Sequence, residues 1–126
     1  MRIIIATGAS GGHSFPALAV ADELKGTNAL LFICDRGKME EVIRAKGFRC
    51  FSVTLTKFTG LSTLPVFLVA LKRAYQDCLK VLNDFSAQAV AGFGSYASVA
   101  AVLAARSKGI PVIIHEQNAR PGKANR

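Results

Sequence analysis

Apolar residues in this chain fall into short runs that alternate with longer segments of helical periodicity. Five runs are rich in Val, Ile, Leu, Ala, Phe and Cys and are too short to be helices: residues 2–6, 29–34, 50–53, 88–92 and 111–115. The segments between them repeat apolar residues every three or four positions: residues 13–25, 37–46, 64–85 and 96–108. The pattern predicts five strands alternating with four helices.

The strands are continuously apolar, which is typical of a parallel sheet covered by helices on both faces. Strand–helix alternation of this kind predicts an α/β fold, a Rossmann-like doubly wound parallel sheet. The length of 126 residues suits one domain. Residues 1–126 carry no internal repeat or linker, so we expect a single domain.

Composition narrows the class of partner. The formal net charge of +8 favours anionic partners such as lipid headgroups or phosphorylated substrates. The basic residues are spread along the chain without interleaved aromatics, so we expect no nucleic-acid binding. The spacing of Cys34, Cys50 and Cys78 matches no zinc or redox motif, which predicts three reduced, mostly buried thiols. The apolar stretch at residues 61–71 is shorter than the roughly 20 residues of a spanning helix.

The first strand leads into a glycine-rich loop, Gly8-Ala9-Ser10-Gly11-Gly12-His13, followed by a helix. Glycines allow close backbone approach, and a helix N-terminus attracts anions, so the loop suits a phosphate. Its spacing is neither the dinucleotide fingerprint nor a Walker A loop. His13 lies at the ligand-binding edge of such a sheet, where it is either a proton acceptor or simply a capping or surface residue.

A second glycine loop, Gly92-Phe93-Gly94-Ser95-Tyr96, follows the fourth strand and also opens a helix, with a hydroxyl expected at the cap position. Two helix N-termini at one sheet edge suit a diphosphate better than a single phosphate. The sequence leaves two roles open for Tyr96: lining the cleft or packing.

The last strand runs into the polar string His115-Glu116-Gln117-Asn118. Amides and carboxylates at that edge suit sugar hydroxyls, which need both donors and acceptors. Neighbouring residues on an extended chain point apart, so His115 and Glu116 make a poor metal pair, and we expect no metal and no cofactor.

The helix at residues 64–85 begins with an apolar segment that ends in two cations. Its candidate membrane-contact residues are Leu64, Phe67, Leu68, Leu71, Lys72 and Arg73. One face must pack on the sheet, and the other either meets an anionic membrane surface or is buried at a domain interface.

Taken together, the two glycine loops, the Phe15-Pro16-Ala17-Leu18 string and the His115–Asn118 string resemble the MurG family of inverting glycosyltransferases. The resemblance covers essentially the whole chain in order. It implies the N-terminal, acceptor-side half of a GT-B enzyme, a pair of Rossmann-like domains. Such enzymes transfer N-acetylglucosamine from UDP-N-acetylglucosamine to the C4 hydroxyl of undecaprenyl-diphosphate-linked muramyl-pentapeptide, at the cytoplasmic face of the bacterial inner membrane, as peripheral proteins.

The resemblance also implies roles for single residues. His13 would be the general base, and Ser10, Gly11, Gly12 and Asn118 would face the donor. The residues expected to hold the acceptor and its diphosphate are Gly8, Gly92, Gly94, Ser95, Tyr96 and Glu116. Ala9 and Ser10 depart from the family pattern, which has Gly and Thr there; Ser10 keeps the hydroxyl, and we expect the loop to persist.

The uridine-binding half of the family is not represented in the sequence, so we expect this hexosyltransferase domain to be inactive without a C-terminal donor-binding domain, in cis or in trans. The alternative is a non-catalytic, membrane-anchoring, acceptor-binding subunit of a split lipid-linked-sugar glycosyltransferase. A nucleotide-binding or redox domain, with Asp35 as ribose ligand, is disfavoured by the glycine spacing.

Overall fold

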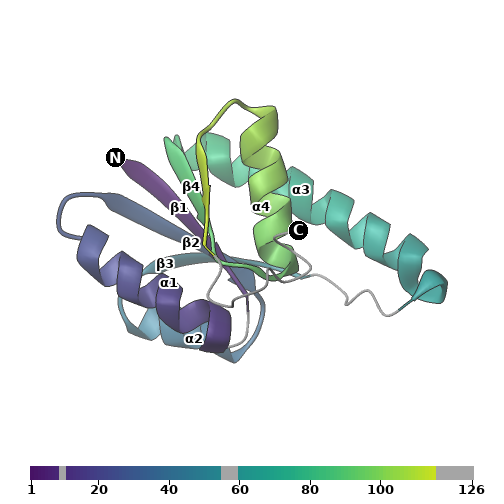
Figure 1. Ribbon diagram of the computed structural model, residues 1–126, viewed down its shortest axis with the longest axis horizontal. Coiled ribbons are helices and arrows are strands. Elements are labelled where there is room, and N and C mark those ends of the chain that lie inside the picture. Colours follow the sequence, from purple (N-terminus) through teal and green to yellow (C-terminus); the bar gives the residue numbers. More distant parts are fainter. Residues whose placement is uncertain (9–10, 55–59, 116–126) are drawn as a thin grey trace.

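The computed structural model describes residues 1–8, 11–54 and 60–115 and, within the first helix, side chains from Ser14 onward. Strands and helices alternate along the chain, as predicted (Figure 1). The elements are β1 (Arg2–Thr7), α1 (Gly11–Leu24), β2 (Ala29–Asp35), α2 (Lys38–Ala45), β3 (Arg49–Val53), α3 (Leu64–Phe85), β4 (Ala89–Gly92), α4 (Ser95–Ser107) and β5 (Val112–Ile114). A short 3-10 helix, η1 (Leu61–Thr63), precedes α3 and was not predicted.

All five strands are parallel and lie in the order β3-β2-β1-β4-β5. The chain builds outward from β1 to one edge of the sheet, returns through α3, and builds outward again from β4. This is the Rossmann-like doubly wound arrangement that the sequence predicted, with helical crossovers between all consecutive strands.

Alternation along each strand separates two cores, one on each face of the sheet. On β1, Ile4 and Ala6 pack with α3 and α4, whereas Ile5 packs with α1 and α2. The neighbouring β2 repeats the division, with Ile33 in the first core and Phe32 in the second. Because the central strands are buried on both faces, their apolar runs are continuous rather than alternating. The edge strand β5 is the exception, since Ile113 and Ile114 are exposed.

Gly47 and Gly109 directly follow the helices predicted at residues 37–46 and 96–108, a position at which glycine favours the end of a helix, and each of them does end a helix. Gly47 and Gly109 have φ values of 90° and 71°, a region that favours glycine. After each of them a backbone N–H reaches back over the last turn: Phe48 donates to the Ile43 carbonyl at 3.3 Å, and Ile110 donates to the Ala105 carbonyl at 2.9 Å. These are the bonds of a glycine C-cap, which turn the chain toward the next strand.

The second half of α3 is buried against the rest of the domain, whereas the first half contributes no fully buried side chain. Its buried residues begin at Ala74 and continue through Cys78 to Phe85. In Figure 1 the first half extends away from the sheet, beyond the body of the domain. The residues before Ala74 therefore present apolar side chains that the described part of the chain leaves largely uncovered.

All three cysteines are buried, as predicted. Cys34 and Cys50 lie on adjacent strands with their Sγ atoms 2.8 Å apart. The hydrogen bond to Cys50, together with burial, raises the pKa of Cys34, while the same bond lowers the pKa of Cys50. On α3, burial raises the pKa of Cys78 to about 12.

Candidate functional site

The sheet brings three polar segments together at its carboxyl edge. The Phe93 N–H donates to the Ala6 carbonyl at 2.9 Å, and the His115 N–H donates to the Gly92 carbonyl at 2.8 Å. The segments that follow β1, β4 and β5 are therefore neighbours, although they are far apart in the sequence. Helix α1 leaves β1 on one face and α4 leaves β4 on the other, so the site lies at the switch point where doubly wound sheets bind ligands.

The start of α4 has an unusual backbone. Gly94 is the N-cap, with φ 95°, and Ser95 follows with φ 78°. A non-glycine residue in this region is strained by about 1–3 kcal/mol, and such strain concentrates at ligand sites. No side-chain hydrogen bond caps this helix, so the prediction of a capping hydroxyl, that of Ser95, is wrong. The first-turn N–H groups keep their capacity to bind an anion.

Two buried hydroxyls at this edge lack a hydrogen-bond partner within the described part of the chain: Thr7 Oγ1, at the end of β1, and Ser95 Oγ. Thr7 is fully buried. A buried hydroxyl without a hydrogen-bond partner destabilises the fold by about 1–3 kcal/mol. A ligand bound at this edge of the sheet would supply the missing partners, which explains why two such hydroxyls lie there. Sequence reasoning missed Thr7 because a threonine ending an apolar strand is an ordinary strand residue.

The predicted loop glycines have packing roles as well. A Cβ atom on Gly92 would lie 2.6 Å from Ser98 Oγ and 3.2 Å from Val102 Cγ2 of α4, so only glycine lets the helix pack this closely. The carbonyl of Gly8 accepts a hydrogen bond from Ser14 Oγ, which ties the end of β1 to α1. These contacts hold both helix N-termini against the sheet edge.

The structure gathers most of the predicted diphosphate residues. Gly8, Gly92, Gly94, Ser95 and Tyr96 all lie at the β1–β4 edge. Gly11, Gly12 and His13 form the first turn of α1, which begins two residues earlier than predicted. Ser10, Glu116 and Asn118 fall outside the described residues.

Tyr96 makes a packing contact, one of the two roles considered for it, and its role in lining the cleft stays a prediction. Its half-buried ring meets Phe67 of α3 edge-on, with ring centroids 5.2 Å apart and planes at 72°. At the β5 end of the edge, the His115 ring lies 5.1 Å from the Phe93 ring. The Tyr96–Phe67 contact joins the second glycine loop to the apolar half of α3.

The candidate membrane-contact residues divide by exposure. Leu68, Lys72 and Arg73 are exposed, whereas Leu64, Phe67 and Leu71 are half-buried, the last against the core. The exposed apolar surface is carried largely by residues absent from the predicted set: Leu61 is 83% exposed, Val66 58% and Val69 56%. Helical periodicity cannot show which face the sheet covers.

Among the residues the structure describes, no three His, Cys, Asp or Glu side chains gather as a metal cluster. The same residues contain no helix of the length and apolarity needed to span a bilayer.

Comparison with known proteins agrees with this architecture. The family model for the glycosyltransferase family 28 N-terminal domain matches residues 3–126. Relatives from Citrifermentans bemidjiense and Geobacter sp. strain M21 are 39% and 38% identical over 132 residues. Both are named UDP-N-acetylglucosamine--N-acetylmuramyl-(pentapeptide) pyrophosphoryl-undecaprenol N-acetylglucosamine transferase. Their alignments cover all of this chain but 37% and 36% of the relatives, so the chain spans little more than a third of their length.

Solved structures give the same result. The crystal structure of Acinetobacter baumannii MurG matches with a TM-score of 0.82 and 30% identity, over 98% of this chain and 37% of that one. A UDP-GlcNAc 2-epimerase from Neisseria meningitidis, bound to UDP-GlcNAc, matches with a TM-score of 0.72 over all of this chain and 37% of that one. At 20% identity, the second match shows a shared fold alone.

Proposed function

The chain belongs to the family of glycosyltransferase family 28 N-terminal domains, and from that premise we propose that it is the acceptor-side domain of a peptidoglycan-synthesis glycosyltransferase. The reaction is transfer of N-acetylglucosamine from UDP-N-acetylglucosamine to the C4 hydroxyl of the lipid-linked muramyl-pentapeptide. The relatives that carry this activity in their names support the proposal. The observation that carries it is the pair of glycine loops that meet at the β1–β4 switch point.

The acceptor diphosphate binds between the two loops. The uncapped start of α4 supplies backbone N–H donors, and Ser95 Oγ and Thr7 Oγ1 supply hydroxyls without a partner within the described residues. Diphosphate oxygens accept hydrogen bonds from both kinds of donor. Ser10, Gly11, Gly12 and Asn118 face the donor nucleotide sugar, and Glu116 assists the acceptor.

The chemistry requires a base near the attacking hydroxyl. The C4 oxygen forms a bond to the anomeric carbon while the bond from that carbon to the diphosphate oxygen breaks. UDP leaves with the bonding electrons, and configuration at the anomeric carbon inverts. His13, in the first turn of α1, takes the hydroxyl proton, since histidine is the side chain that most often serves as a general base.

The donor-binding half is a separate C-terminal domain, in cis or in trans, and the exposed first half of α3 rests on the anionic inner leaflet. Apolar side chains enter the lipid interface while Lys72 and Arg73 meet the headgroups. The enzyme thus works as a peripheral protein on the cytoplasmic face of the inner membrane.

The test is glycosyl transfer from radiolabelled UDP-N-acetylglucosamine to a short-chain lipid acceptor. The chain is assayed alone and with the C-terminal domain of a MurG relative supplied in trans. We expect product only with the added domain. His13→Ala should then lower kcat by about 10²–10⁴-fold with little change in acceptor KM, because a general base contributes that much. Asp22→Asn, in an exposed position later on α1, is the matched control.

The outcomes separate the two candidate functions. Acceptor binding without product under any condition would support the non-catalytic, membrane-anchoring subunit, for which the uncovered half of α3 would be the anchor. Product from the chain alone would refute the need for a second domain. Equal loss of kcat in the Asp22→Asn control would remove His13 from its role.

Thr7→Val tests the diphosphate site independently. Valine has nearly the shape of threonine but lacks the unpaired hydroxyl, so the variant should fold at least as stably as the parent. Its acceptor KM should rise several-fold if the hydroxyl binds the diphosphate. A stabilised variant with unchanged KM would show that Thr7 does not contact the acceptor.

A further inference from the structure

Two of the three cysteines meet in the core beside the β2–β3 pair. Cys34 lies on β2 and Cys50 on β3, and their Sγ atoms are 2.8 Å apart. The two residues are 16 positions apart in the sequence, a spacing that matches no redox motif. The parallel pairing of the strands brings the thiols together, on the face of the sheet that packs against α1 and α2.

The two thiols meet along a diagonal of the strand pair. Cys34 lies opposite Ser52, and Cys50 lies opposite Phe32. Diagonal neighbours have more widely separated backbones than opposite residues do. An S–S bond of about 2.05 Å therefore requires β3 to shift toward β2. The position of β3 permits that shift, because it is an edge strand and pairs with β2 alone among the described strands.

Cys50 is suited to be the sulfur that reacts first. It is 8% exposed, whereas Cys34 is fully buried. Arg44 Nη2 donates to the Cys50 carbonyl at 2.7 Å, which holds a guanidinium charge beside the residue. The hydrogen bond with Cys34 lowers the pKa of Cys50, burial opposes this shift, and Arg44 lowers the pKa further. The thiolate is the reactive form of cysteine, and redox-sensitive cysteines often lie next to a second, resolving thiol.

We propose that Cys34 and Cys50 are a reversible disulfide site, closed by a small hydroperoxide and opened by a thiol reductant. The Cys50 thiolate attacks one oxygen of the peroxide, the O–O bond breaks, hydroxide leaves, and a sulfenic acid forms. The Cys34 sulfur then bonds to the Cys50 sulfur, the S–O bond breaks, and the hydroxyl leaves with the Cys34 proton as water. The two sulfurs lose two electrons, and the peroxide is reduced to water. This chemistry is independent of the proposed function.

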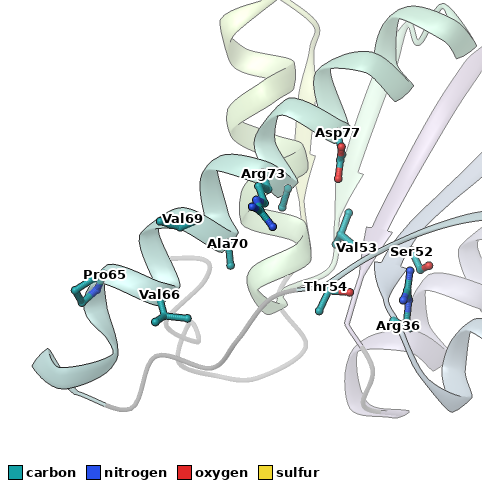
Figure 2. A pocket seen from close by; sticks show the side chains of 11 residues that line it. Arg36, Ser52, Val53, Thr54, Pro65, Val66, Val69, Ala70, Arg73 and Asp77 are labelled. Carbon is teal, nitrogen blue, oxygen red and sulfur yellow. The ribbon is translucent and has the colours of Figure 1, made fainter.

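The bond acts on the carboxyl edge of the sheet. Arg36 and Ser52 each lie two residues beyond one of the cysteines. Both line a pocket of about 570 Å³ at that edge, together with Arg73 of α3 (Figure 2). The Arg36 N–H donates to the Val53 carbonyl at 3.1 Å, so the ends of the two strands are tied to each other. A shift of β3 toward β2 therefore changes the lining of this pocket.

The experiment exposes the folded chain to hydrogen peroxide at neutral pH, stops the reaction with catalase, and counts thiols with a maleimide reagent after denaturation. The reduced chain has three thiols. We expect one thiol to remain, with a mass loss of two hydrogen atoms, and dithiothreitol to restore all three. Peptide mapping should place the bond between Cys34 and Cys50. Three intact thiols after peroxide treatment would overturn the proposal.

Cys78→Ser is the matched control, because Cys78 lies on α3 in the core on the other face of the sheet. This variant should still lose both of its thiols, whereas Cys34→Ser and Cys50→Ser should form no bond within the chain. A bond that includes Cys78 would overturn the proposal. A gain of oxygen atoms without a cross-link would also overturn it, because Cys34 would then not resolve the oxidised Cys50. The count on the parent chain does not depend on the folding of any variant.

Urea unfolding and two-dimensional NMR test whether the native fold accommodates the bond. The bond closes a loop that contains α2, and closing such a loop restricts the unfolded chain. The oxidised chain should therefore unfold at a urea concentration higher by roughly 1 M. Its amide shifts should change at Arg36 and Ser52 and stay unchanged at the distant Arg106. A lower unfolding midpoint would refute closure in the native fold, and unchanged shifts at Arg36 and Ser52 would refute the effect on the pocket.

Discussion

Replacing Gly92 with alanine should destabilise the chain through one identifiable contact. The added Cβ would lie 2.6 Å from Ser98 Oγ and 3.2 Å from Val102 Cγ2. Helix α4 has little room to retreat, because Ala97 and Ala101 beside the contact are fully buried. Overpacking of this kind costs about 1–3 kcal/mol. The smaller conformational entropy of the unfolded chain offsets about 0.4–1 kcal/mol of that, so we expect a net loss near 1–2 kcal/mol.

The assay is urea unfolding followed by far-UV circular dichroism. For a chain of this size, the expected loss lowers the unfolding midpoint by about 0.5–1 M. Gly26→Ala is the matched control, because Gly26 is exposed and a Cβ there meets nothing within 4 Å. It should leave the midpoint unchanged or slightly raised.

A second substitution identifies the contact. Ser98→Ala removes the oxygen at 2.6 Å, so Gly92→Ala should cost less in its presence, by a coupling energy of about 0.5–2 kcal/mol. The reasoning fails if Gly92→Ala and Gly26→Ala unfold at the same urea concentration. It also fails if the effects at positions 92 and 98 simply add. If Ser98→Ala restores part of the stability lost in Gly92→Ala, Gly92 has a role in helix–sheet packing as well as in the loop.

Three further outcomes follow from burial and charge. Leu82 is 1% exposed, so Leu82→Ala should lower the free energy of unfolding in urea by about 2–5 kcal/mol. Leu68 is 51% exposed, so Leu68→Ala should lower it by less than about 0.5 kcal/mol and should instead weaken the binding of the chain to vesicles in a flotation assay. Because burial raises the pKa of Cys78 to about 12, iodoacetamide at pH 8.5 should label it far more slowly in the folded chain than in guanidinium; equal rates would contradict its burial. Glu40→Gln removes the 3.0 Å ion pair between Glu40 and the half-exposed Arg44. The free energy of unfolding should change by no more than about 0.5 kcal/mol, because exposed ion pairs contribute little. A larger loss that persists at high salt would show that Glu40 stabilises the fold by more than charge pairing.

Local patterns predicted most of the fold. Each apolar run became a strand within a residue or two, and Gly47 and Gly109 end their helices as expected, because positive φ at a helix end is a local requirement. Parallel strands share one carboxyl edge, so the sequence could also place both glycine loops on the same side of the sheet. The roles of Ser10, Glu116 and Asn118 stay predictions.

What the sequence by itself determined is therefore the type, order and approximate ends of the elements, since period and capping depend on neighbours in the chain. Only the tertiary structure decided which elements meet. The order β3-β2-β1-β4-β5 sets Ala6 beside Gly92, leaves Thr7 Oγ1 buried without a partner in the described chain, and leaves the first half of α3 uncovered. It also brings Arg36 and Arg73 to one pocket. Such pairings join distant parts of the chain through packing, and periodicity within one element carries no information about them.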